Sequence, residues 1–258
     1  MVRVRHIGTL GMLIGALLMA FPVVGAPQAS DTIPAEGGEI VITPITHGSV
    51  QIEFGGQVID VDPWGQGDYT GKPQADLILV TDIHGDHLDA EKIGQLRKEG
   101  APVVAPAAVA EQAGDAVQGI TVIANGETKT VAGVSIQAVP MYNLERGPEP
   151  GQLFHTKGRG NGYVLTLGGK RVYFSGDTEC VPEIRALENI DVAFMTMNLP
   201  YTMPPSEAAD CVKAFQPAIV YPYHFRGSDL NEFSSALASE SNIEVRVRKW
   251  YADAPSGE

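Results

Sequence analysis

The sequence Thr81-Asp82-Ile83-His84-Gly85-Asp86-His87 decides how this chain folds and where its chemistry lies. It directly follows Ala75-Asp76-Leu77-Ile78-Leu79-Val80, an apolar run with the length and composition of a buried strand. In open α/β sheets, binding sites form just beyond the carboxyl ends of the strands. Ionisable groups beside a buried strand must be paired, hydrated or bound to a cation. We therefore expect a divalent metal site here, with four candidate ligands: Asp82, His84, Asp86 and His87.

Two later segments place further candidate ligands directly after apolar stretches. Asp177 follows the strand expected at residues 171–175, and His224 follows the one expected at residues 218–221. If these strand ends meet at one sheet edge, their imidazoles and carboxylates suffice for two divalent ions, with one carboxylate bridging both. Two neighbouring ions can deprotonate a water and stabilise an oxyanion on a carbonyl or phosphoryl centre. The predicted cofactor is one or two divalent metal ions.

The overall composition indicates a globular, acidic protein. The 258 residues suit one large domain or two small ones, and 44% apolar residues against 19% charged ones allow a substantial core. The formal net charge of −13 repels nucleic acid and anionic lipid. The expected partner is therefore a small-molecule substrate and not a nucleic acid.

The N-terminus has the layout of a secretory signal peptide. Arg3 and Arg5 precede an apolar run at residues 7–25, and small residues follow it. A retained membrane anchor is the alternative, because the run approaches the length of a spanning helix. Pro22 and the small residues favour cleavage, and the lack of a nearby Cys disfavours a lipoprotein. We predict a signal peptide over residues 1–26 and a periplasmic or secreted protein that leaves the membrane after cleavage.

The chain has two cysteines, Cys180 and Cys211. In an oxidising compartment they can form one disulfide if their Cα atoms lie close enough. Two buried free thiols are an equally good interpretation of the sequence.

Alternating strand and helix signals fill the rest of the chain. Residues 27–38 predict a flexible leader, residues 39–252 a single domain and residues 253–258 a tail. Strands are expected at residues 39–44, 49–54, 57–62, 76–81, 102–105, 120–123, 129–131, 134–139, 162–167, 171–175, 192–197, 218–221 and 245–250. Helices are expected at residues 89–98, 107–113, 183–187, 206–215 and 229–239. The order of strands followed by helices occurs twice along the chain. This repetition predicts a four-layer αββα sandwich, which is a mixed α+β or α/β fold with two packed sheets between helices.

The chain resembles the metallo-β-lactamase fold hydrolases. The resemblance rests on Asp-x-His-x-Asp-His after a strand, a later Gly-Asp-Thr and a final lone His, and it extends over residues 39–250. The chain is similar in particular to the branch of ascorbate-6-phosphate lactonase-like proteins, through segments that include Thr46-His47-Gly48-Ser49, Val61-Asp62-Pro63 and Asn198-Leu199-Pro200-Tyr201-Thr202-Met203. This resemblance implies a hydrolase with the αββα fold.

The resemblance also implies a set of metal ligands. One ion would be held by Asp82, His84 and Asn143, and the other by Asp86, His87 and His224, with Asp177 as the bridging ligand. Asp82 replaces the usual first His of the family, and Asn143 replaces the His of its middle loop. Both changes put oxygen in place of imidazole at the same position. That position should bind zinc less tightly, favour Mn or Fe, or stay partly empty, so a single-metal enzyme is an alternative.

Two further polar residues have both a functional and a structural interpretation. Asp62 suits a carboxylate that supports a metal-bound imidazole, or an Asx turn before Pro63. His47, between two expected strands, either faces the metals or is a hydrogen-bonded turn residue.

A small basic loop contains His155, Lys157 and Arg159, with glycines around them. We expect a mobile lid that binds a phosphate or carboxylate of the substrate, with His155 as a catalytic proton donor. A solvated hairpin loop is the alternative. Arg226, close to His224, either binds the same anionic group or forms a surface salt bridge.

Together these patterns predict an exported metal-dependent hydrolase. A metal-bound hydroxide would attack an ester, lactone, amide or phosphoester bond of a small anionic substrate, with Asp86 holding the water. The alternative is a metal- or ligand-binding protein of the same fold whose catalysis has lapsed, which Asp82 and Asn143 keep open. Oxygen chemistry at a di-iron site ranks last, because the chain has no room for the flavin domain that usually accompanies it. The sequence predicts no oligomeric state.

Overall fold

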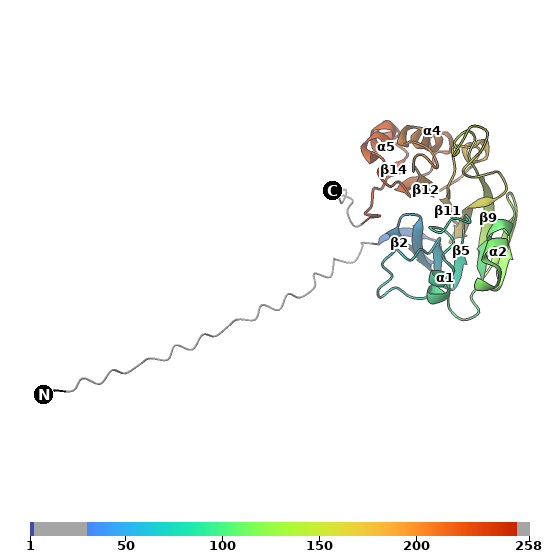
Figure 1. Cartoon of the computed structure of the whole chain (residues 1–258). Helices are drawn as coiled ribbons and strands as arrows, with labels where there is room; N and C mark the ends of the chain where they lie inside the picture. The colour runs from blue at the N-terminus through green and yellow to red at the C-terminus, as the bar shows by residue number, and fades with distance from the viewer. Residues whose placement is uncertain (3–29, 252–258) are drawn as a thin grey trace.

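The computed structural model describes residues 1–2 and 30–251. Two seven-stranded sheets lie face to face, and helices cover the outer side of each (Figure 1). The predicted four-layer αββα sandwich is therefore confirmed. The signal peptide predicted over residues 1–26 and the tail at residues 253–258 lie outside the described residues, apart from the first two, and stay predictions. Among the described residues, no helix combines the length and apolar character needed to cross a membrane.

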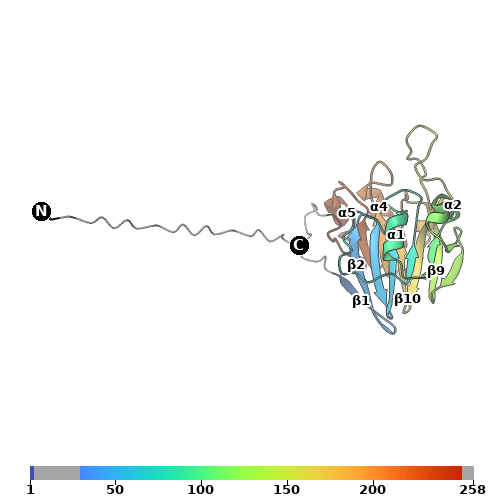
Figure 2. The same ribbon diagram turned by 60° about the horizontal axis from the view of Figure 1, so that its bottom comes forward.

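The first sheet contains its strands in chain order. Strands β1 to β4 are antiparallel neighbours, and β4 to β7 run parallel. The strands are β1 (Asp31–Ala35), β2 (Gly38–Thr46), β3 (Ser49–Phe54), β4 (Gln57–Val61), β5 (Leu77–Leu79), β6 (Val103–Ala105) and β7 (Ile120–Val122). Its helices are α1 (Ala90–Leu96), α2 (Ala107–Ala113) and the short η1 (Gly114–Ala116). In Figure 2, β1 and β2 lie at one side of the sandwich and β9 lies toward the other.

The second sheet repeats this plan. Strands β8 to β11 are antiparallel, and β11 to β14 are parallel. The strands are β8 (Thr128–Val131), β9 (Val134–Met141), β10 (Gly160–Leu167), β11 (Lys170–Phe174), β12 (Val192–Thr196), β13 (Ile219–Tyr223) and β14 (Glu244–Val245). Its helices are α3 (Pro182–Arg185), α4 (Pro205–Phe215) and α5 (Leu230–Leu237).

The inner faces of the two sheets form the main core. Leu77 and Leu79 of β5 belong to the cluster that also contains Phe174 and Phe194 of the second sheet. The residue between them, Ile78, belongs to the cluster under α1 and α2. Strand β5 is thus covered on both faces, which is why it is a continuous apolar run. This burial fixes the strand whose end carries the Asp82–His87 segment.

The prediction of a flexible leader at residues 27–38 is wrong from residue 31 onward, and residues 27–29 lie outside the described part of the chain. Strand β1 pairs with β2 through a turn that contains Gly37, whose φ of 87° favours glycine. Pro34 is tolerated because β1 is the edge strand of its sheet. The Pro and Gly signals mark an edge and a turn here.

The strand expected at residues 245–250 is also wrong beyond Val245. The chain leaves the sheet edge there, because Arg248 turns to a neighbouring carboxylate. Its Nε and Nη2 atoms donate to the two oxygens of Asp31 at 2.9 Å each. This ion pair fixes the C-terminal segment against β1 and not as a long edge strand.

A disulfide joins Cys180 and Cys211, whose Cα atoms lie 5.6 Å apart. It answers the question that the sequence leaves open between a disulfide and two free thiols. The bond connects the loop after β11 to α4. Because that loop also carries Asp177, the bond limits how far the loop can move from the second sheet.

Asp60 on β4 is a buried carboxyl with few partners. It is 1% exposed, accepts one hydrogen bond, from Nε2 of Gln51 at 2.9 Å, and its Oδ2 has no hydrogen-bond partner among the described residues. Burial raises the pKa of Asp60 to about 7, and the bond from Gln51 offsets this only in part. The folded protein therefore keeps a proton here that the unfolded chain releases near pH 3.8.

The substitution Asp60→Asn is expected to flatten the pH dependence of stability between about pH 4 and about pH 7. In the wild type the folded state holds one more proton across this window, so the free energy of unfolding falls as the pH rises. The effect of this one group is on the order of 4 kcal/mol at most. Urea unfolding of both proteins at about pH 4.5 and about pH 8 measures it. An identical pH response in the two proteins would mean that Asp60 is ionised in the folded state.

Candidate metal centre

The three segments that the sequence singled out converge at one edge of the sandwich. The loop after β5 supplies Asp82–His87, the loop after β11 supplies Asp177, and the residue after β13 is His224. Their donor atoms form groups that could each hold an ion, with all atoms of a group within 4.8 Å of one another. The groups are Asp82, His84 and His155; His87, Asp177 and His224; and His47, Asp86 and His224.

The group of His87, Asp177 and His224 is buried throughout. Nε2 of His87 lies 3.4 Å from Oδ2 of Asp177, and Nε2 of His224 lies 3.4 Å from its Oδ1. Such spacings match the edge of a tetrahedron about an ion with bonds of roughly 2.1 Å. Among the described residues neither imidazole Nε2 has a hydrogen-bond partner, although both are buried. Buried donor atoms that converge without hydrogen-bond partners of their own can share one cation, so these residues fit a divalent metal.

The group of Asp82, His84 and His155 also lies against Asp177. Nδ1 of His84 is 2.8 Å from Oδ2 of Asp82, and Nε2 of His155 is 3.8 Å from the same oxygen. Nε2 of His155 is also 3.4 Å from Oδ2 of Asp177 and has no hydrogen-bond partner among the described residues. Asp177 therefore faces both groups, which is the place of a bridging ligand.

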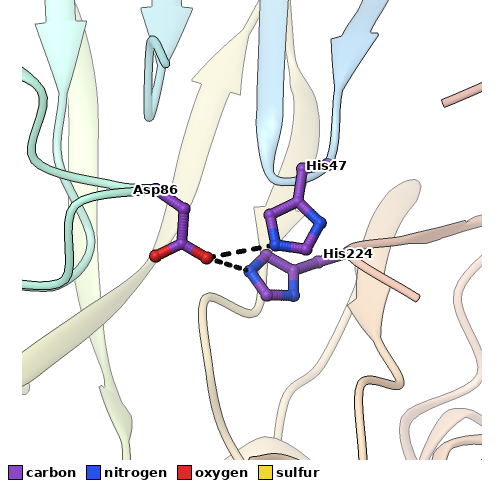
Figure 3. Close-up of side chains that lie close together, drawn as sticks. All are labelled: His47, Asp86 and His224. Carbon is purple, nitrogen blue, oxygen red and sulfur yellow. Dashed lines mark hydrogen bonds and ion pairs between the residues drawn. The ribbon is translucent and has the colours of Figure 1, made fainter. Parts of the chain in front are cut away.

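In the third group, two imidazoles lie against one carboxylate. Figure 3 shows the imidazoles of His47 and His224 aimed at one oxygen of Asp86, at 3.1 and 3.4 Å. The hydroxyl of Tyr251 hydrogen-bonds to Nδ1 of His47, which leaves Nε2 as the donor to Asp86. His47, which the sequence left between a metal-facing and a turn residue, thus holds Asp86 in place.

His47 and His224 pack tightly against each other. Their ring centroids lie 3.6 Å apart, and the His47 carbonyl accepts from the backbone N–H of His224. A Cβ on Gly48 would lie 3.1 Å from the ring of His224, so a larger residue here would press on that imidazole. Both histidines also have left-handed backbone, with φ of 51° and 47°. Such conformations are rare outside Gly and occur often at functional sites, where the surrounding structure enforces them.

The charges of the centre depend on one another. Burial and, to a smaller extent, the neighbouring imidazoles lower the pKa of His47 to about 4, although Asp86 opposes this shift. Burial would lower the pKa of His87 too, but the carboxylates of Asp62 and Asp177 outweigh it and raise that pKa well above its ordinary value. Burial would raise the pKa of Asp177, but the facing imidazoles hold it well below. The centre thus keeps its carboxylates ionised and attracts positive charge, as a metal site must.

Asp62 holds the imidazole of His87 from behind. Its Oδ2 lies 2.8 Å from Nδ1 of His87 and accepts from the hydroxyl of Thr81, while its Oδ1 accepts from the Thr81 N–H. A carboxylate on Nδ1 directs the lone pair of Nε2 toward Asp177. Of the two interpretations of Asp62 that the sequence allowed, the structure supports the one in which it orients an imidazole.

The prediction of Asn143 as a metal ligand is wrong. Its Oδ1 accepts two hydrogen bonds, from the backbone N–H of His155 at 2.8 Å and from its Nδ1 at 2.7 Å. Its Nδ2 donates to Glu179 and to the carbonyl of Tyr201. Both lone pairs of the amide oxygen are used, so Asn143 orients His155, which takes the place among the donors that the sequence gave to Asn143.

The basic loop is not a mobile lid with free charges. His155 is 1% exposed, and its backbone carbonyl accepts from the Asn143 N–H, so its ring is fixed in the centre and does not meet solvent as the expected proton donor. Lys157 pairs with Glu183, and Arg159 pairs with Asp82. Both cations are thus paired with carboxylates of the protein, which corrects the prediction of free positive charges in an anion-binding lid.

A cavity of about 810 Å³ opens over the donors. Its walls include the apolar or aromatic side chains of Trp64, Phe154, Leu199 and Tyr201, and Arg226 also lines it. Among residues 30–251 Arg226 forms no ion pair, and its guanidinium lies over the ring of Tyr251. The cavity thus offers apolar walls, a row of metal donors and one uncompensated cation.

Comparisons with known proteins agree with this geometry. A model of the beta-lactamase superfamily domain matches residues 41–224. The UPF0173 metal-dependent hydrolase of Pyrococcus abyssi is 30% identical over 220 residues, which cover 77% of this chain and 92% of the relative. A solved metal-dependent hydrolase from Parabacteroides distasonis is 39% identical with a TM-score of 0.80, covering 87% of this chain and 100% of that one. The metallo hydrolase Igni18 from Ignicoccus hospitalis shares the fold, with a TM-score of 0.67 at 24% identity over 81% of this chain and 94% of that one. The predicted superfamily is confirmed, while the ascorbate-6-phosphate lactonase branch stays a prediction.

The substitution Asp62→Asn is expected to lower metal affinity by about 10- to 100-fold while the fold is retained. Asn tolerates the left-handed backbone at this position (φ 45°) and can still accept from Thr81. Its NH₂ group, however, would face Nδ1 of His87 and favour the tautomer in which Nε2 carries the proton. Competition with a fluorescent chelator measures the affinity. The matched control is Asp60→Asn, on the strand that directly precedes Asp62, and an equal loss in both variants would contradict the role of Asp62.

Proposed function

Because the chain belongs to the beta-lactamase superfamily of metal-dependent hydrolases, we propose that the donors around Asp177 bind divalent metal. With this metal the protein would hydrolyse a small anionic substrate. The observation that carries the proposal is the set of buried donor atoms that have no hydrogen-bond partner within residues 30–251, on His87, His155, Asp177 and His224. The proposed ligands are Asp82, His84 and His155 on one side, and Asp86, His87 and His224 on the other, with Asp177 between them.

Metal ions bound there would lower the pKa of a water and stabilise the oxyanion of the transition state. The residues of the chain supply the rest. Asp86 has the carboxylate that best reaches the cavity, since its side chain is 29% exposed while that of Asp177 is 5% exposed. His47 fixes its orientation by donating to Oδ2. We therefore assign Asp86 the task of orienting the attacking water and accepting its proton.

The cavity supports a particular class of substrate. Trp64, Phe154 and Tyr201 favour a molecule with an apolar or aromatic body, because such walls bury its surface. Arg226 favours a carboxylate or phosphate group on the same molecule, since a guanidinium binds either with paired hydrogen bonds. The scissile bond would be an ester, lactone, amide or phosphoester that lies over the metal donors.

A protein of the same fold whose catalysis has lapsed is the second candidate. The observation in its favour is that Asp82, in the position of the family's first His, is fully buried and paired with Arg159. Metal analysis of the purified protein separates the two candidates. A lapsed protein that no longer binds metal would contain almost none, while the proposed hydrolase contains at least one ion per chain.

The substitution Asp86→Ala is expected to lower turnover by at least about 100-fold. The substrate is first found by screening metal-loaded protein against lactones, phosphodiesters, thioesters and a chromogenic β-lactam. Removal of metal by a chelator should abolish the same activity, and Zn²⁺ or Mn²⁺ should restore it. Asp210→Ala, on the exposed side of α4, is the matched control. Turnover that survives Asp86→Ala would remove the water-orienting role from this carboxylate.

The substitution Arg226→Gln is expected to raise KM for an anionic substrate by about tenfold or more and to change kcat little. A neutral analogue, such as the methyl ester of the same acid, should be unaffected. Steady-state kinetics on the pair of substrates measures the difference. Lys249→Gln removes the same charge from an exposed site and serves as the control. Equal losses for the charged and neutral substrates would show that Arg226 does not bind the anionic group.

We also propose that the protein is exported. The N-terminal pattern and the disulfide between Cys180 and Cys211 support this, because disulfides persist in oxidising compartments. Fractionation of cells that express the full chain, followed by N-terminal sequencing and thiol counting, tests it. The expected product lies outside the cytosol, begins near residue 26 and has no free thiol. A full-length cytosolic protein with two free thiols would contradict export.

A further inference from the structure

The two donor groups differ in charge, because only one of them contains a fixed cation. Nε and Nη2 of Arg159 donate to the two oxygens of Asp82, at 3.1 and 3.0 Å. Among residues 30–251, neither Asp86 nor Asp177 has a Lys or Arg partner, and neither has Asp62 behind His87. The carboxylates around His87 thus keep their negative charge without a Lys or Arg partner in this part of the chain, while Arg159 neutralises the carboxylate beside His84.

Arg159 is held firmly in this position. It directly precedes β10, whose Asn161 donates its N–H to the carbonyl of Thr81 at 2.9 Å. A Cβ on Gly160 would lie 3.0 Å from the same carbonyl, so the start of β10 lies directly against the Asp82 loop. The Arg159 side chain is only 19% exposed. The pair is therefore a built part of the centre and not a chance contact between surface side chains.

From this arrangement we infer that Arg159 makes the two metal positions unequal. The position of Asp82, His84 and His155 binds its ion weakly and exchanges it, and the position of Asp86, His87 and His224 binds tightly. The physical reason is that an ion bound to Asp82 lies close to the guanidinium that shares its oxygens, in a buried setting where like charges repel strongly. The guanidinium also withdraws electron density from both oxygens by its two hydrogen bonds. This inference rests on the proposed metal centre, and it names the residue that sets how many ions the protein retains.

The test is a titration of the metal-free mature protein with Zn²⁺ or Mn²⁺ against a fluorescent chelator at one fixed pH. The wild type should show two dissociation constants that differ by at least about tenfold. Arg159→Gln should tighten the weaker constant by about tenfold or more and change the tighter one by less than about threefold. Lys157→Gln, which removes a cation of the same loop that pairs with Glu183, should leave both constants unchanged. Circular dichroism confirms that each variant is folded.

Two further variants assign the constants to positions. His84→Ala should remove the weaker constant, and His87→Ala the tighter one. Equal constants in the wild type would overturn the inference, as would a weaker constant that Arg159→Gln leaves unchanged or weakens further. A weakening would mean that Arg159 orients Asp82 as a ligand. None of these readouts requires turnover, so a protein with unequal constants and no hydrolysis would refute the proposed hydrolase and leave this inference standing.

Discussion

The carboxylate of Asp177 faces three imidazoles, and the rest of the centre is arranged around this contact. Nε2 of His87, His155 and His224 each lie 3.4 Å from one of its oxygens, and the residue is only 4% exposed. A buried carboxylate is costly unless positive charge lies beside it. Without metal, a proton on His87 supplies such charge, because the carboxylates of Asp62 and Asp177 raise the pKa of His87 well above its ordinary value. A divalent ion supplies it to several donors at once, so protons and metal compete for the same atoms.

The fold makes this contact possible by holding strained loops on rigid sheets. His47, Asp62 and His224 all have left-handed backbone, a conformation that costs on the order of 1–3 kcal/mol at a non-glycine residue. Each of them directly follows a strand of a buried sheet. The inter-sheet core fixes the strand ends, and the disulfide fixes the loop of Asp177 to α4. The donor side chains are therefore held in place before any metal binds. Metal binding then costs little further conformational entropy.

The parts of the centre that local sequence could predict are those that follow a buried strand. Asp82–His87, Asp177 and His224 each come after an apolar run, and the structure brings them together. The contacts that local sequence could not predict join residues that lie far apart in the chain. Asn143 and His155 exchange hydrogen bonds across an intervening loop, and Arg159 reaches Asp82 from a position 77 residues away. No periodicity or motif records such pairs. For β1 the difficulty was different, since an edge strand with a Pro has the composition of a linker.

Two residues of the segment before β10 compensate for the two departures from the family pattern. Where Asn143 lacks an imidazole, His155 supplies one and Asn143 orients it. Where Asp82 brings a charge in place of a neutral imidazole, Arg159 neutralises it. A segment committed to these two contacts cannot open and close as a lid without dismantling the centre. Substrate recognition must then come from the other walls of the cavity, where Leu199 and Tyr201 are about half exposed. Apolar side chains left in contact with water beside a row of metal donors are best explained by a ligand that covers them.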